Sequence, residues 1–161
     1  MFDPDENGVI ATVHAAQPRR YFACVVLFLL GGALIYTALA QPPALPWLLM
    51  LLGIGGASLL LGERLWRATQ LAIVMTETEL RDTSGAVLAR MDEISHVDRG
   101  ALAMKPANGF TLVLTTRRTR GWSPGLWWRI GKRVGVGGVT AAGETKFMAE
   151  QIAARIGRRD A

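Results

Sequence analysis

Two apolar segments near the N-terminus constrain this chain more than any other feature. Residues 21–40 contain no charged side chain, and residues 46–62 are again uncharged after a short linker. At about 1.5 Å per residue, twenty helical residues cross the roughly 30 Å hydrocarbon core of a bilayer. The sequence therefore predicts two transmembrane helices within residues 20–67, the second reaching Trp66.

The linker between the two segments sets their arrangement. Pro42 and Pro43 cannot extend the first helix, and Pro46 suits the first turn of the second. Since the linker is so short, the two helices are expected to be antiparallel neighbours.

Small residues on the second helix predict close helix packing, because they let backbones approach in a membrane. Gly53 and Ala57 lie four apart, as do Ser58 and Gly62. The alternative is that small residues are simply common in such helices. The residues predicted to pack against the first helix or against a partner are Gly53, Gly56 and Ala57.

The charges that flank the two helices predict their orientation. Arg19 and Arg20 precede the first helix, Arg64 and Arg67 follow the second, and the linker is uncharged. Because short cytoplasmic flanks are enriched in Lys and Arg, we expect a multi-pass protein with both termini in the cytoplasm.

A cleaved secretory signal is the alternative interpretation of the first segment. The arginines, the apolar run and Ala38-Leu39-Ala40 together imitate a signal with an A-x-A cleavage site. However, the run exceeds the roughly 7–15 apolar residues of a typical signal, acidic residues precede it, and a second apolar segment follows at once. We therefore expect the segment to be retained.

After Arg67 the pattern changes to short strands separated by turn signals. Residues 83–85 (Thr-Ser-Gly) predict a hairpin turn between strands at 80–82 and 87–90. Residues 110–115 (FTLVLT) form the clearest strand in this part of the chain.

The two ends of the chain are expected to complete this β-rich domain. Within the N-terminal segment 1–19, residues 8–14 alternate weakly and predict an edge strand, with an unstructured segment as the alternative. Glycines within 134–140 indicate a bulge or close backbone approach. Helical periodicity over 143–156 predicts an amphipathic helix that Gly157 ends. The expected core residues are Leu80, Ile94, Val97, Phe110, Leu112, Leu114, Met148 and Ile152.

The order of these elements resembles the bacterial pleckstrin-homology-like (PH-like) domain family. The resemblance rests on residues 75–80 (MTETEL), Gly85, residues 91–97 (MDEISHV) and the final helix, and covers about 70–156. It implies a fold of two antiparallel transmembrane helices followed by an antiparallel β partial barrel with a C-terminal helix, in an α+β cytoplasmic domain at 68–161. It also implies no catalytic residues, and a location in the bacterial inner membrane.

Residues 117–133 depart from the family pattern and form a Trp- and Arg-rich insertion. The insertion holds six basic residues and three tryptophans, and no acidic residue occurs between 99 and 143. Ser123 followed by Pro124 predicts a short helix over 124–131. The predicted lipid- or partner-binding residues are Arg117, Arg118, Arg120, Trp122, Trp127, Trp128, Arg129, Lys132 and Arg133.

Three interpretations of this insertion remain open. Tryptophan and arginine suit a membrane interface, where indole is amphipathic and guanidinium pairs with phosphate. They equally suit contact with a protein partner. In the third interpretation the tryptophans are buried in the core, and the arginines form a solvated rim.

The chemistry-bearing residues are sparse. His14 and His96 lie far apart and outside any metal-ligand spacing, and the single Cys24 lies in the first apolar segment. The glycines at 135–138 lack the rest of a phosphate-binding loop. We therefore predict no catalytic, metal or cofactor site, and the net charge of +5 favours an anionic partner.

Two functions follow from the sequence. The first is a non-enzymatic membrane scaffold, an accessory subunit or assembly factor that contacts a larger membrane protein complex. The alternative is a membrane-anchored module that binds anionic phospholipid through 117–133. Nucleic acid is a less favoured partner, although the tryptophans could stack on bases.

Overall fold

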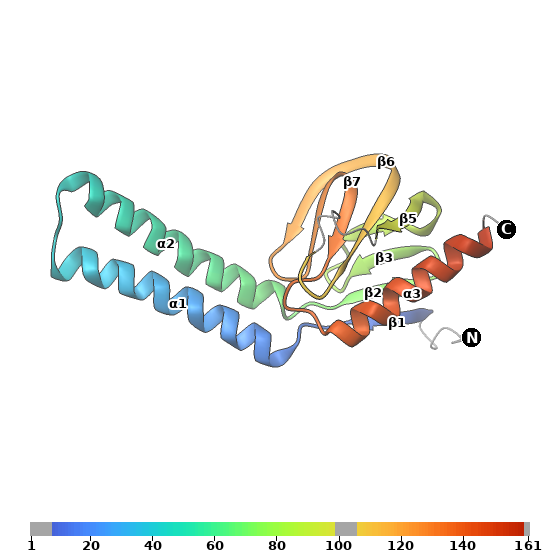
Figure 1. The fold of residues 1–161 in the computed structure, drawn as a ribbon, viewed down its shortest axis with the longest axis horizontal. Helices are drawn as coiled ribbons and strands as arrows, with labels where there is room; N and C mark the ends of the chain where they lie inside the picture. Colours follow the sequence, from blue (N-terminus) through green and yellow to red (C-terminus); the bar gives the residue numbers. More distant parts are fainter. Residues whose placement is uncertain (1–7, 99–105, 160–161) are drawn as a thin grey trace. The chain divides into compact units, whose positions relative to one another are not determined.

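The computed structural model describes residues 8–98 and 106–159 and divides the chain into two compact units. The helical unit spans residues 17–67, and the β-rich unit is built from the segments that flank it in sequence (Figure 1). The predicted N-terminal segment 1–19 and the domain at 68–161 therefore belong largely to one unit. Residues 1–7, 99–105 and 160–161 lie outside the described residues.

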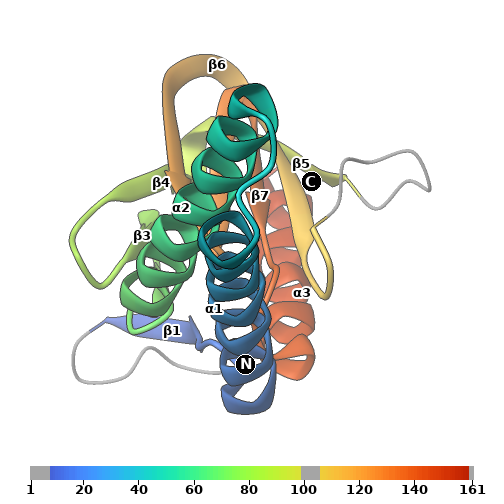
Figure 2. The ribbon, with the colours of Figure 1, turned by 90° about the vertical axis from the view of Figure 1, so that its left-hand side faces the viewer.

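The helical unit consists of α1 (Gln17–Ala40) and α2 (Leu45–Ala68), joined by a four-residue linker and lying side by side in Figures 1 and 2. Both are long and apolar enough to cross a membrane, and only 17% of the most apolar window of each is buried. So large an exposed apolar surface requires lipid or protein to cover it. The two predicted segments are confirmed as helices, with α1 beginning at Gln17 rather than at residue 20, and their crossing of a membrane stays a prediction.

Small residues form the contact between the two helices. On α1, Cys24, Gly31 and Ala38 are buried and lie seven residues apart. A Cβ atom on Gly31 would lie 2.8 Å from the Gly55 carbonyl oxygen, and one on Gly55 would lie 2.8 Å from Ile35 Cγ1. The backbones therefore touch where Gly31 meets Gly55. Ser58 and Gly62 are also buried, on the same side of α2.

The residues predicted for this packing lie elsewhere on α2. Gly53 and Ala57 are exposed and Gly56 is half-buried, and a Cβ on either glycine would meet no atom within 4 Å. The prediction that they pack against α1 is therefore wrong. Gly55 is the glycine that turns toward α1, because positions 53 and 57 lie about 200° away from it at 100° per residue. Packing of these residues against a partner stays a prediction.

The first sheet of the β-rich unit has four antiparallel strands in the order β1-β2-β3-β4. The strands are β1 (Val9–Val13), β2 (Ile73–Thr76), β3 (Glu79–Asp82) and β4 (Val87–Arg90). The predicted edge strand in 8–14 is confirmed, since β1 lies at the edge and pairs with β2. The helical unit is thus inserted between two neighbouring strands.

The second sheet has three antiparallel strands in the order β5-β6-β7. After the 3₁₀ turn η1 (Met91–Glu93) come β5 (Ile94–Asp98), β6 (Phe110–Ser123) and β7 (Trp127–Val136). Helix α3 (Ala142–Arg159) then packs against β1, β5 and β6.

One core fills the space between the sheets and α3. Seven of the eight expected core residues are buried, and Val97 is partly buried against the same cluster. The predicted end of the last helix is wrong, because α3 continues past Gly157 to Arg159. The Arg159 guanidinium donates to the carbonyl oxygens of Met91, Asp92 and Ile94, which fixes the last turn of α3 against η1.

Candidate functional surface on the β6–β7 arch

Strands β6 and β7 form one long hairpin, residues 110–136, which bends over in Figure 1 and is called the arch below. The helix predicted over 124–131 is wrong, and 117–133 is the outer part of these two strands rather than an insertion between them. The Leu126 amide donates to the Ser123 carbonyl oxygen at 3.1 Å, and Gly125 has φ of 77°. Pro124 and Gly125 thus occupy the positions that a type II turn favours.

The tip of the arch is hydrogen-bonded to the segment that follows β7. The Gly137 amide donates to the Leu126 carbonyl oxygen at 2.8 Å, and the Val139 amide donates to Gly125 at 3.0 Å. Gly138 has φ of 126°, and its Cβ would lie 2.8 Å from the Gly125 oxygen. This confirms the close backbone approach predicted from the glycines of 134–140.

Trp128 shows how strongly β7 is bent. A Cβ on Gly135 would lie 2.3 Å from Nε1 of the Trp128 indole, although the two residues are seven apart in one strand. A straight strand would separate them by more than 20 Å. The half-buried indole therefore occupies the space that the absent side chain of Gly135 leaves.

Trp127 is buried in the core of the β-rich unit. Its side chain is 6% exposed, and its Nε1 donates to Asp82 Oδ2 at 3.1 Å. The other carboxylate oxygen of Asp82 accepts from the amides of Ser84 and Ala86, each at 3.0 Å. The buried Asp82 thus fixes the β3–β4 turn and holds the arch. The expectation that Trp127 is exposed for binding is wrong.

Arg129 links the two sheets through side-chain hydrogen bonds. Its guanidinium donates to the carbonyl oxygens of Val87 and Leu88 on β4, and Nε donates to the Thr119 carbonyl oxygen at 2.7 Å. It also lies over the Trp127 ring, 5.8 Å from the centroid. Burial lowers the pKa of Arg129, but a guanidinium keeps its proton in proteins. Arg129 therefore joins β7 to β4 where no backbone ladder does.

Arg118 is held by Glu93. Two parallel hydrogen bonds of 2.8 Å join the guanidinium to the carboxylate, and both side chains are mostly covered. The hydrogen bonds from Arg118 lower the pKa of Glu93, against an opposing effect of burial, and the same bonds raise the pKa of Arg118. This pair anchors the arch to the end of η1.

The remaining predicted residues are exposed side chains of the arch, apart from the half-buried Trp128. Trp122 is 59% exposed, and the neighbouring Ile130 is 52% exposed. A shallow pocket of about 320 Å³ opens beside them, lined by both and by Arg120, Gly121, Trp128 and Arg129. Within residues 8–98 and 106–159, no ion-pair partner is present for the four exposed cations of the arch. These cations are Arg117, Arg120, Lys132 and Arg133.

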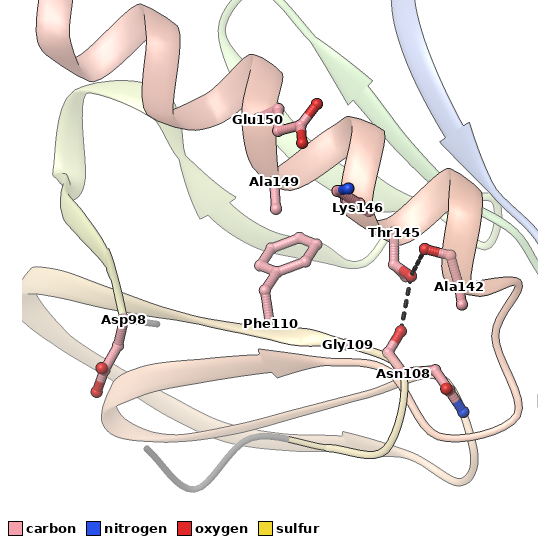
Figure 3. A pocket seen from close by; sticks show the side chains of 9 residues that line it. All are labelled: Asp98, Asn108, Gly109, Phe110, Ala142, Thr145, Lys146, Ala149 and Glu150. Carbon is pink, nitrogen blue, oxygen red and sulfur yellow. Dashed lines mark hydrogen bonds between the residues drawn. The ribbon is translucent and has the colours of Figure 1, made fainter. Parts of the chain in front are cut away.

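A second, larger pocket of about 510 Å³ lies between the start of β6 and α3 (Figure 3). The Phe110 ring points toward Ala149, and the Thr145 hydroxyl donates to the Asn108 carbonyl oxygen at 2.6 Å. Lys146 and Glu150 lie along the helix at its rim. The sequence did not predict this pocket. It forms between the start of β6 and α3, which lie some 35 residues apart in the chain, so no local pattern indicates it.

Chemistry-bearing groups are dispersed over the part of the chain that the structure describes. There, no three side chains of His, Cys, Asp or Glu gather as metal ligands would. His14 lies against Glu144, with Nδ1 3.3 Å from Oε2, and His96 lies on β5 beside Ser95.

Comparisons with known proteins return no relative. No family model matches the chain, and searches of curated proteins and of solved structures find no similar sequence or fold.

Proposed function

We propose that this protein is a non-enzymatic membrane-anchored scaffold, an accessory subunit or assembly factor of a larger membrane protein complex. In this proposal α1 and α2 cross the bacterial inner membrane with both termini in the cytoplasm, and the arch binds an acidic face of the complex. The observation that carries the proposal is a hairpin with four exposed cations that have no ion-pair partner among the described residues, together with the exposed side chains of Trp122 and Ile130. Aromatic and arginine side chains dominate the energy of protein interfaces.

Two further features favour a docking role. The arch is fixed by Arg129, Asp82 and the tip hydrogen bonds, and a pre-ordered surface loses little entropy on binding. On α2, the exposed small residues Gly53 and Ala57 are left unused by α1, so they are free to receive a helix of the complex.

Binding of anionic phospholipid by the arch is the second candidate. The adjacent exposure of Trp122 and Ile130 favours it, because an indole and an aliphatic side chain between arginines suit the headgroup region. The linkers between the two units are short. Three residues separate β1 from α1, and four residues separate α2 from β2. In this proposal the β-rich unit is therefore tethered to the membrane by short linkers.

The β-rich unit is also proposed to be a PH-like domain. Two antiparallel sheets followed by a C-terminal helix agree with what the sequence resemblance implies. In this proposal the helical unit is an insertion between β1 and β2, the first two strands of the domain.

Site-specific photo-crosslinking in the native membrane tests the docking role. A crosslinking residue at position 122 or 53 of the full chain is expected to capture one and the same complex at both sites. Charge reversal in Lys132→Glu with Arg133→Glu should abolish the capture, whereas Lys146→Glu on α3 should leave it intact. Capture of lipid alone at position 122, lost at high salt, would replace this function with the second candidate.

A further inference from the structure

An apolar groove runs between the two helices of the helical unit, near the ends where the chain enters and leaves it. Its volume is about 330 Å³. Four of its lining residues lie on one face of α1, and the other two lie in the last two turns of α2. The lining residues are Tyr21, Cys24, Val25, Phe28, Glu63 and Trp66.

Glu63 is the one charged group in this lining and the only acidic residue between positions 17 and 68. Its carboxylate pairs with Arg67 one helical turn later, and the two side chains are 50% and 76% exposed. Glu63 directly follows the uncharged run 46–62, so in an inserted helix it would lie at the end of the apolar span, near the lipid headgroups. The pair places a negative and a positive charge side by side at the mouth of the groove.

A second cation lies at the same mouth. The Arg20 guanidinium stacks over the Trp66 ring, 4.1 Å from its centroid, and Nη2 donates to the Trp66 carbonyl oxygen at 3.4 Å. Its buried Nε has no hydrogen-bond partner among the described residues. A buried N–H without an acceptor is unfavourable, so a phosphate oxygen that reached it would relieve this cost.

We propose that the groove binds one molecule of phosphatidylethanolamine, an inference that rests on the proposed membrane insertion of α1 and α2. An acyl chain lies against Val25 and Phe28, the primary ammonium donates to Glu63, and the phosphate accepts from Arg67 and Arg20. The headgroup dipole is then antiparallel to the Glu63–Arg67 pair. A phosphatidylglycerol headgroup has no cation for Glu63, and the quaternary ammonium of phosphatidylcholine has no N–H to donate.

Native mass spectrometry of the full chain from nanodiscs with equal ethanolamine, glycerol and choline lipids tests this assignment. The chain is expected to retain the ethanolamine lipid about tenfold over the choline lipid, the scale of one charge-assisted hydrogen bond. Glu63→Gln should remove the preference. The neighbouring Arg64→Gln, which does not line the groove, should keep it.

A second pair of variants tests the groove without touching its charges. Val25→Trp fills the groove and should reduce retention of the ethanolamine lipid at least fivefold. Leu29→Trp, an exposed position outside the lining, should not. Equal retention of the three lipids, an unchanged preference in Glu63→Gln, or a preference for the glycerol lipid would each overturn the inference, as would a protein helix crosslinked at position 25.

Failure of this inference can be separated from failure of the proposed function. If alkaline carbonate extracts the full chain from membranes, membrane insertion itself is wrong. If the chain stays in the membrane and shows no lipid preference, only the ethanolamine site is wrong.

Discussion

The two sides of the β6–β7 arch use the same residue types for opposite purposes. On one side, Trp127 and Arg129 turn inward and satisfy Asp82 and the open edge of β4. On the other, Trp122 and Arg120 remain exposed. A Trp- and Arg-rich segment within a strand is therefore not one surface, because a strand sends successive side chains to opposite faces. Four of the nine predicted binding residues therefore stabilise the fold: Arg118, Trp127, Trp128 and Arg129.

Truncating one tryptophan from each side of the arch is expected to give the largest difference in stability. Trp127→Ala is expected to lower the free energy of unfolding by about 3–5 kcal/mol, as for other buried aromatic residues. Trp122→Ala should change it by no more than about 0.5 kcal/mol, as for exposed positions. Denaturant titration of the full chain in detergent measures both. Equal losses would mean that the two tryptophans are not on different sides.

The arginines give the next largest contrast. Arg129→Met removes the donors to Val87, Leu88 and Thr119 and is expected to cost about 2–3 kcal/mol, because their carbonyl oxygens lose a partner. Arg120→Met should be close to neutral in the same titration. If Arg129→Met left the free energy of unfolding unchanged, water would be replacing the guanidinium, and its hydrogen bonds would not stabilise the contact between the two sheets.

The helical unit offers the same comparison between an inner and an outer face. Gly55→Leu forces a side chain against Ile35 and the Gly31 backbone, and overpacking of this kind costs about 1–3 kcal/mol. Gly53→Leu meets no atom within 4 Å of its Cβ and should leave the melting temperature of the detergent-solubilised chain unchanged. If Gly53→Leu were the more damaging variant, the seam between the helices would be assigned to the wrong face.

The smallest expected effect is the pH dependence of the Glu93–Arg118 pair. Hydrogen bonds from Arg118 hold the folded-state pKa of Glu93 below its ordinary value of 4.5. The pair therefore contributes its full stabilisation above about pH 4.5, and the contribution is lost as the pH falls through the lower, folded-state pKa. Unfolding of the parent and of Glu93→Gln should differ by up to about 1 kcal/mol at pH 7 and converge toward pH 3. A gap that is constant with pH would show that the carboxylate does not titrate with folding.

Sequence patterns predicted the elements well where one local rule dominates. The uncharged runs predicted α1 and α2, Thr83-Ser84-Gly85 predicted the β3–β4 turn, and apolar alternation predicted most of the core. One feature that sequence patterns miss is the tip of the arch. Pro124-Gly125 is a type II turn signal, whereas Ser123-Pro124 imitates the start of a helix.

Sequence alone shows two long apolar helices, a β-rich unit after them, and a concentration of cations in 117–133. These follow from composition and short-range periodicity, which act within one element. Which cations are exposed and which glycines come into contact depends on the tertiary structure. Those outcomes depend on contacts between residues far apart in the chain, such as Trp127 with Asp82 and Gly31 with Gly55. A one-residue change of register would reverse which side chains face inward, and single-residue propensities do not fix that register.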